Sequence, residues 1–326
     1  MSRILASLSA VAALMGGTAM AEVPNVVADI APVHSLVARV MEGVGTPDLI
    51  LPPGASPHEY SLRPSEAGAL QDADVVVWTG ARLAPWMEGA VETLAEDSGV
   101  LTLLEADETK LLDSRQNALF EKHSHGHDEE PGEEEHDHED HAEGEHAHED
   151  EHDHANGKYD AHAWLSSENA ATWLNLIAAE LSSADPDNAG TYFANAAAGR
   201  EELKGLKSEV NATLDPVRGG SFIVFHDAFQ YFEADFDFPA SGAISLSDAQ
   251  DPSPARIAEI QKRVRDEGID CVLAEPQFNP DLVATVLDGT EAKTGVIDPL
   301  GIDLEPGSAL YPQLIRNIAA TLADCL

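Results

Sequence analysis

The sequence predicts an α/β protein of two lobes, each a parallel sheet flanked by helices, joined by a long linking helix. Short apolar runs alternate with helical patterns in both halves of the chain, an order typical of parallel sheets covered by helices. Between the halves, a helical pattern over 187–214 would be about 40 Å long, enough to link two domains. The length of 326 residues also suggests about two domains.

The N-terminal lobe is predicted to occupy 22–186. Apolar runs between turn residues indicate its strands, and apolar residues at helical spacing indicate its helices. A mostly apolar run such as 74–78 is typical of a parallel strand buried on both faces. The predicted order is a strand at 23–30, a helix at 33–41 ended by Gly43, strands at 48–51 and 74–78, a helix from Pro85 and a strand at 100–104.

A segment of different character interrupts this lobe at 123–154. Apart from Pro131 it has no aliphatic residue larger than alanine, and it has no Lys or Arg. Such a segment buries too little apolar surface to offset the entropy of ordering its backbone, so we expect a disordered surface loop. Its histidines are candidate weak metal sites, with a solvated charge run as the alternative: His123, His125, His127, His136, His138, His141, His146, His148, His152 and His154.

Order resumes with a helix capped by Ser166 or Ser167, and Pro186 separates it from the linking helix at 187–214. The same alternation of strands and helices follows over 215–326, the predicted C-terminal lobe. Its elements are a strand at 222–225, a helix at 256–266, a strand at 271–274, a helix including 283–287, a strand at 295–297 and a last helix at 312–322.

Composition excludes several classes of function. Lys and Arg total 18 against 59 Asp and Glu, a formal net charge of -41, which argues against nucleic acid and against anionic lipid as partners. Hydrophobic residues make up 43% of the chain, enough for a packed core. Two cysteines exclude a cysteine zinc finger, an iron–sulfur ligand set and a disulfide-dense scaffold.

Residues 1–21 have the pattern of a cleavable signal peptide. Arg3 supplies the positive start, Ile4–Met15 is apolar, and Ala19-Met20-Ala21 fits the small-x-small cleavage pattern. A membrane-spanning helix needs about 20 apolar residues, and no stretch of the chain is that long. We therefore expect cleavage after Ala21, no insertion in the membrane, and a mature protein outside the cytoplasm, in the periplasm of a Gram-negative cell.

The compartment affects how the two cysteines are interpreted. An oxidising space favours a disulfide between Cys271 and Cys325, and closing the loop between them would contribute roughly 4 kcal/mol. Such a bond would attach the last helix to a strand. Two free thiols are the alternative, and a two-cysteine metal site is disfavoured because neither cysteine has a ligand residue nearby.

Four histidines lie outside the 123–154 segment. His34 falls within helical periodicity and is interpreted as structural. His58 and His226 follow predicted strands, as does Asp298, and ligands of open parallel sheets bind beyond the carboxyl ends of the strands. His162 precedes a helix in the segment that re-enters the first lobe. Three imidazoles and one carboxylate suit tetrahedral Zn²⁺, whereas Ca²⁺ and Mg²⁺ prefer oxygen.

Five motifs resemble the periplasmic zinc-binding proteins of zinc ABC importers, the ZnuA type within the cluster of metal-receptor proteins. They follow the order of that family and span nearly the whole mature chain. In this sequence they read PGASPHEYSLRPS over 53–65, DAHAWLS over 160–166, FHDAFQYF over 225–232, AEPQF over 274–278 and IDPLG over 297–301. A histidine- and acid-rich loop before the second ligand, and the pair Cys271 and Cys325, also resemble the zinc branch.

The resemblance implies that His58, His162 and His226 bind the metal and that Asp298 completes the site. Manganese receptors of the cluster tend to carry a carboxylate at the position of His226, so this residue favours zinc. Pro57 stands where some zinc members have an acidic residue, which strengthens Asp298 as fourth ligand, with water as the alternative. Ser167 replaces a proline at a helix start. The linking helix is rigid in this family, which implies small motion on binding.

The predicted function is a receptor that captures Zn²⁺ in the periplasm, as a monomer, and delivers it to the membrane permease of an ABC transporter. The alternatives are a manganese receptor of the same cluster, a periplasmic zinc store or chaperone without a transporter, and a zinc hydrolase. Four protein ligands would leave no open position for catalysis, so an enzyme is not expected. If Asp298 does not bind, Glu59 and Glu275 become candidate bases.

Overall fold

The structure is a computed structural model that describes residues 23–117, 120, 159–246 and 252–326. The predicted signal peptide and the ten histidines of the 123–154 segment lie outside these residues. No described helix has the length and apolar character needed to span a membrane.

The first sheet is parallel, with the strand order β2-β1-β3-β4. In β1, Val27 pairs with Asp48 of β2 on one side and Val76 of β3 on the other. Successive side chains of the central strands enter opposite cores, as the strand period of two requires. The elements are β1 (Val26–Ala28), α1 (Ala31–Val40), β2 (Asp48–Leu49), α2 (Pro64–Gln71), β3 (Val75–Trp78), α3 (Pro85–Leu94), β4 (Gly99–Thr102) and α4 (Ser167–Ala184).

Helices cover both faces of this sheet. Val75 and Val77 pack in one core with α1 and α4, whereas Val76 and Trp78 pack in a second core with α2 and α3. This two-sided burial explains why the run over 75–78 is apolar without alternation. The sequence-based prediction of a parallel sheet covered on both faces is therefore confirmed for this lobe.

The second sheet repeats the arrangement with the parallel order β6-β5-β7-β8. Ile223 and Phe225 face a core with α7 and α8, and Phe222 and Val224 face the core shared with α6 and α9. The elements are β5 (Phe222–His226), α6 (Gln230–Phe236), β6 (Gly242–Ser245), α7 (Pro254–Glu267), β7 (Cys271–Ala274), α8 (Pro280–Leu287), β8 (Lys293–Val296) and α9 (Leu310–Cys325).

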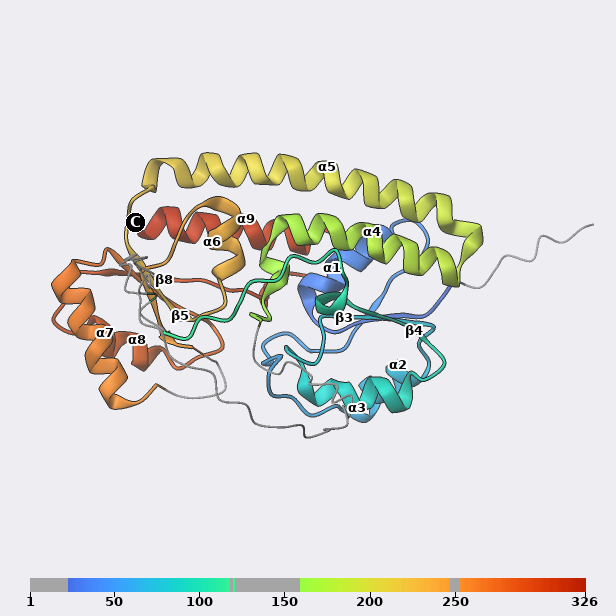
Figure 1. The fold of residues 1–326 in the computed structure, drawn as a ribbon, viewed down its shortest axis with the longest axis horizontal. Coiled ribbons are helices and arrows are strands. Elements are labelled where there is room, and N and C mark those ends of the chain that lie inside the picture. The colour runs from blue at the N-terminus through green and yellow to red at the C-terminus, as the bar shows by residue number, and fades with distance from the viewer. Residues whose placement is uncertain (1–22, 118–119, 121–158, 247–251) are drawn as a thin grey trace, which may run out of the picture.

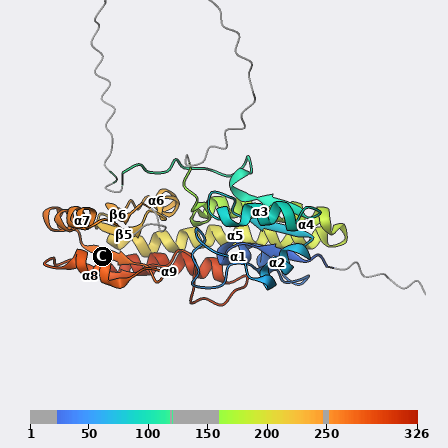
Figure 2. The same ribbon diagram turned by 90° about the horizontal axis from the view of Figure 1, so that it is seen from below.

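A single long helix, α5 (Ala189–Leu214), runs along both lobes, with α4 and α9 beneath it (Figure 1). Viewed from below, it joins the lobe of α1 to α4 with the lobe of α6 to α9 (Figure 2). The predicted linking helix is confirmed, although Pro186–Asn188 forms a 3₁₀ turn in front of it. Packing of α5 against α1, α4 and α9 makes one continuous apolar core, which stiffens the connection.

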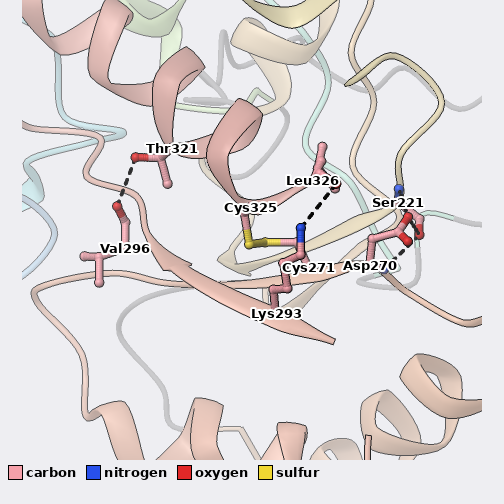
Figure 3. Close-up of a disulfide and its surroundings, with 8 residues drawn as sticks. All are labelled: Ser221, Asp270, Cys271, Lys293, Val296, Thr321, Cys325 and Leu326. Carbon is pink, nitrogen blue, oxygen red and sulfur yellow. Dashed lines mark hydrogen bonds between the residues drawn. A yellow bond between two sulfur atoms is a disulfide. The ribbon is translucent and has the colours of Figure 1, made fainter. Parts of the chain in front are cut away.

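The predicted disulfide is present. Cys271 begins β7 and Cys325 ends α9, with their Cα atoms 5.8 Å apart (Figure 3). Because α9 also packs against α5 and α1, the bond attaches the helix shared by the two lobes to a strand of the second sheet.

Three short elements were not predicted: α2, α6 and β6. Only Leu70 of α2 is buried, so its sequence has almost no apolar periodicity. Helix α6 has only 7 residues, too few for a helical period to show, and β6 has only Ala243 and Ile244 as apolar residues between Gly242 and Ser245. The predicted strand at 100–104 ends at Thr102, and Leu103–Glu105 forms a 3₁₀ turn instead.

Candidate metal centre

Three histidines from separate parts of the chain meet where the lobes face each other. One ligand atom from each of His58, His162 and His226 lies within 4.8 Å of the others. Nε2 of His58 is 3.4 Å from Nε2 of His162, and the rings of His162 and His226 have centroids 5.3 Å apart. Imidazole nitrogens at this spacing can coordinate one transition-metal ion.

His162 is oriented by the residue two positions before it. Oδ1 of Asp160 lies 2.7 Å from Nδ1 of His162 and accepts the backbone N–H of the same residue at 3.0 Å. The hydroxyl of Tyr231, from α6 in the other lobe, donates to the Asp160 carbonyl at 2.9 Å. With Nδ1 donating to the carboxylate, the Nε2 lone pair of His162 is directed to the metal.

His226 has the same kind of support from a neighbouring strand. It is the last residue of β5, and Glu275 follows directly after the adjacent β7. Oε1 of the buried Glu275 lies 2.8 Å from Nδ1 of His226 and accepts the backbone N–H of that residue at 3.1 Å. Parallel pairing therefore places a carboxylate beside the imidazole and directs Nε2 to the metal.

The loop after β2 carries His58. Ser56 Oγ accepts the backbone N–H of His58 at 3.2 Å, and the indole of Trp86 on α3 donates to the Pro57 carbonyl at 2.7 Å. The second bond connects the loop to a helix of the same lobe. The first lobe thus supplies His58 and His162, and the second supplies His226.

Buried charges surround the histidines. Burial raises the pKa of Asp160 to about 7 and that of Asp227 to about 7, whereas the nearby Arg115 guanidinium lowers both. Arg115 donates to Asp227 at 2.8 Å and to Glu233 at 2.7 Å. A divalent cation arriving at the histidines would favour the ionised form of these carboxyl groups.

The carboxylate of Asp298 accepts hydrogen bonds from the turn that follows it. Its Oδ1 accepts the N–H groups of Leu300 and Gly301, both at 2.9 Å, and its Oδ2 accepts that of Ile302 at 2.6 Å. Within the described residues, the group of possible ligand atoms contains the three histidines and not Asp298. The carboxylate stabilises the turn that follows it, and its assignment as fourth ligand stays a prediction.

His34 lies apart from the centre, as expected of a structural histidine. It is buried in α1, and its Nε2 is 3.0 Å from the Pro47 carbonyl oxygen. Burial lowers the pKa of its imidazole.

The cavity beside the histidines has a volume of about 270 Å³. Two arginines, Arg82 and Arg115, line it together with the three histidines, and neither was predicted from the sequence. Arg115 is held there by Asp227 and Glu233 of the second lobe, whereas Arg82 contacts Tyr159 and Ser114. Asp160 and Glu275 lay within the motifs already quoted, and the D-x-H spacing of Asp160 and His162 was a usable local signal.

Two parallel-sheet lobes, a long connecting helix and a histidine cluster contributed by both lobes define a two-lobed binding protein with a metal centre. The family model described as "Zinc-uptake complex component A periplasmic" (ZnuA) matches residues 26–325, and the chain belongs to this family.

Curated relatives agree with the assignment. The chain is 44% identical to the high-affinity zinc uptake system protein ZnuA of Brucella abortus, over 97% of this chain and 95% of the relative. It is 43% identical to the protein of the same name from Paracoccus denitrificans, over 100% of this chain and 98% of the relative.

Solved structures share the fold. A crystal structure of ZnuA superposes with a TM-score of 0.71 at 20% identity, covering 93% of this chain and 99% of the other. The binding protein FpvC from Pseudomonas aeruginosa, solved with Mn²⁺, superposes with a TM-score of 0.73 at 18% identity, covering 93% and 98%. The fold of this chain is therefore shared by solved structures of low sequence identity.

Proposed function

We propose that this chain is the receptor of a zinc importer, which captures Zn²⁺ in the periplasm and delivers it to an ABC permease. The observation that carries the proposal is the cluster of His58, His162 and His226, two of them with Nδ1 held by a carboxylate. Neutral nitrogen ligands with fixed tautomers suit Zn²⁺. The names of the curated relatives support zinc as the cargo and uptake as the task.

Binding requires neutral imidazoles. Zinc affinity should therefore fall as the pH drops through about 6.5, the ordinary pKa of histidine. The continuous core along α5 favours small adjustments of the two lobes over wide closure. On docking, the permease would separate the ligands of one lobe from those of the other and release the ion.

The proposal also covers how the chain is processed and how its lobes are organised. We propose cleavage after Ala21, a monomer in the periplasm, and lobes over 22–186 and 215–326 joined by 187–214. Zinc is cargo in this proposal, so the protein is not an enzyme. The histidines of 123–154 would bind additional zinc weakly. A manganese receptor remains the second candidate because a receptor of the same fold was solved with Mn²⁺.

Calorimetric titration of residues 22–326 with Zn²⁺ and with Mn²⁺ tests the function. We expect one tight zinc event, weaker zinc events, and weaker binding of manganese. His162→Ala should abolish the tight event, and deletion of 123–154 should remove only the weaker ones. Tight binding that survives His162→Ala, or that prefers Mn²⁺, would contradict the proposed receptor.

Asp298→Ala, titrated beside the wild type, tests the fourth ligand. Loss of tight affinity with an intact fold would support coordination by Asp298, whereas unchanged affinity would assign the fourth position to another group. Thermal unfolding of both proteins without metal serves as the control, because Asp298 also stabilises the turn over 300–302.

A further inference from the structure

Arg82, an exposed arginine with no carboxylate partner among the described residues, lines the cavity of the metal centre. Arg82 lies just after β3; its Nε donates to the Tyr159 carbonyl at 3.0 Å, and its Nη2 donates to Ser114 Oγ at 3.4 Å. No carboxylate of the described residues forms an ion pair with it. The chain has 59 acidic and only 18 basic residues, so acidic partners are abundant. Water screens part of the charge of this exposed side chain, but a positive charge at the cavity still opposes cation binding, and a bound anion would offset that repulsion.

Arg115 in the same cavity provides the contrast. Its guanidinium is neutralised by the buried carboxylates of Asp227 and Glu233, at 2.8 and 2.7 Å. Arg82 has no such partner among the described residues, yet it lines the same cavity as His58, His162 and His226. The charge of Arg82 therefore lies at the cavity into which the three histidines point their ligand atoms.

The described ligands also leave the coordination of zinc incomplete. Three neutral imidazoles supply three nitrogen atoms and no negative charge, whereas protein-bound Zn²⁺ is usually four-coordinate. Asp298 directs both carboxylate oxygens to backbone N–H groups. The cavity of about 270 Å³ is several times the share of one water molecule in the liquid, about 30 Å³, so it has room for a small molecule beside the ion.

We propose that the centre binds Zn²⁺ together with a small carboxylate anion from solution, which occupies the fourth coordination position in place of Asp298 and pairs with Arg82. One carboxylate oxygen binds the metal and the other accepts from the guanidinium, the planar group best suited to that contact. The anion compensates one positive charge of the metal–arginine pair. This inference rests on the proposed zinc-binding function and names a second component of its cargo.

Cobalt is a suitable probe because its visible absorption depends on its ligands, and Co²⁺ accepts the same nitrogen and oxygen donors as Zn²⁺. Residues 22–326 loaded with Co²⁺ are titrated with sodium acetate, and with sodium perchlorate as the non-coordinating salt control. Zinc affinity is then measured by chelator competition with and without acetate. The variants are Arg82→Gln and, as the matched control, Arg200→Gln, which removes an arginine that contacts Asn175 on the helical side of the molecule.

We expect acetate, but not perchlorate, to change the cobalt spectrum of the wild type and to tighten zinc binding about tenfold, the effect of one charge-assisted hydrogen bond. Arg200→Gln should behave as the wild type, and Arg82→Gln should lose most of the acetate effect. An acetate-insensitive spectrum in the wild type would overturn the inference, as would an equal acetate effect in Arg82→Gln. If zinc binds tightly in either case, the proposed receptor function stands; absence of tight zinc binding would refute both.

Discussion

Removing the Cys271–Cys325 disulfide should destabilise the protein by an amount that follows from its place in the chain. The bond closes a loop of 54 residues. The chain-entropy relation then gives about 4 kcal/mol of stabilisation, through restriction of the unfolded state. For a chain of this size, that loss corresponds to a fall of roughly 10 °C in the unfolding temperature.

The double variant Cys271→Ala/Cys325→Ala is the appropriate perturbation. Both cysteines are buried, at 0% and 4% exposure, so alanine is preferred to serine, which would bury a hydroxyl group. Urea unfolding of the variant and of the reduced wild type separates two effects. Both proteins lose the cross-link, and only the variant also loses the packing of the sulfur atoms. Agreement of their unfolding free energies within about 1 kcal/mol would assign the effect to the cross-link.

Zinc binding should be almost unchanged in the same variant. Cys271 starts β7, whereas Glu275, which orients His226, follows the other end of that strand. At about 3.3 Å per residue, the two positions are roughly 13 Å apart. A loss of stability below about 1 kcal/mol in both proteins would refute the entropic reasoning. A large fall in zinc affinity without unfolding would show that α9 positions the metal centre.

Three further predictions concern single side chains. Glu275→Gln should weaken zinc binding about 10- to 100-fold, because it removes the carboxylate that orients His226. Glu259→Gln, on the exposed face of α7, is the matched control. Equal zinc affinities of the two variants in calorimetry would contradict this role of Glu275. Burial raises the pKa of Asp29 to about 6, so between about pH 4 and pH 6 the folded protein holds a proton that the unfolded chain has released. The contribution of Asp29 to stability therefore falls as the pH rises through that window, and Asp29→Asn should lack this slope in urea unfolding; a persisting slope would assign it to other groups. Ser166→Ala should cost about 1 kcal/mol by removing the N-cap of α4, measured by thermal unfolding, while Ser183→Ala near the end of the same helix should cost much less.

The local sequence was enough to predict elements with a long helical period or with an apolar run that ends clearly at polar or turn residues. The run over 271–274 coincides with β7, and the helical pattern over 187–214 differs from α5 by two residues at its start. The positions of His58 and His226 at strand ends could be predicted as well, because parallel strands bring their carboxyl ends to one edge of a sheet. Helix α6 was too short for a helical period to be detected, and β6 has too few apolar residues to stand out as a strand.

The tertiary structure decided which of these side chains meet. Asp298 lies after β8 as predicted, but the backbone of the following turn directs three N–H groups to its carboxylate, and such a turn cannot be deduced from strand order. The pairing of Glu275 with His226 depends on the adjacency of β7 and β5, which are separated by two helices and a further strand in the sequence. The approach of Arg82 to the metal cavity likewise depends on long-range packing. Hydrophobic periodicity and the residues that end helices or form turns are local features, so they can be recognised along the sequence. The direction of a side chain and the identity of its neighbour depend instead on contacts between residues far apart in the chain.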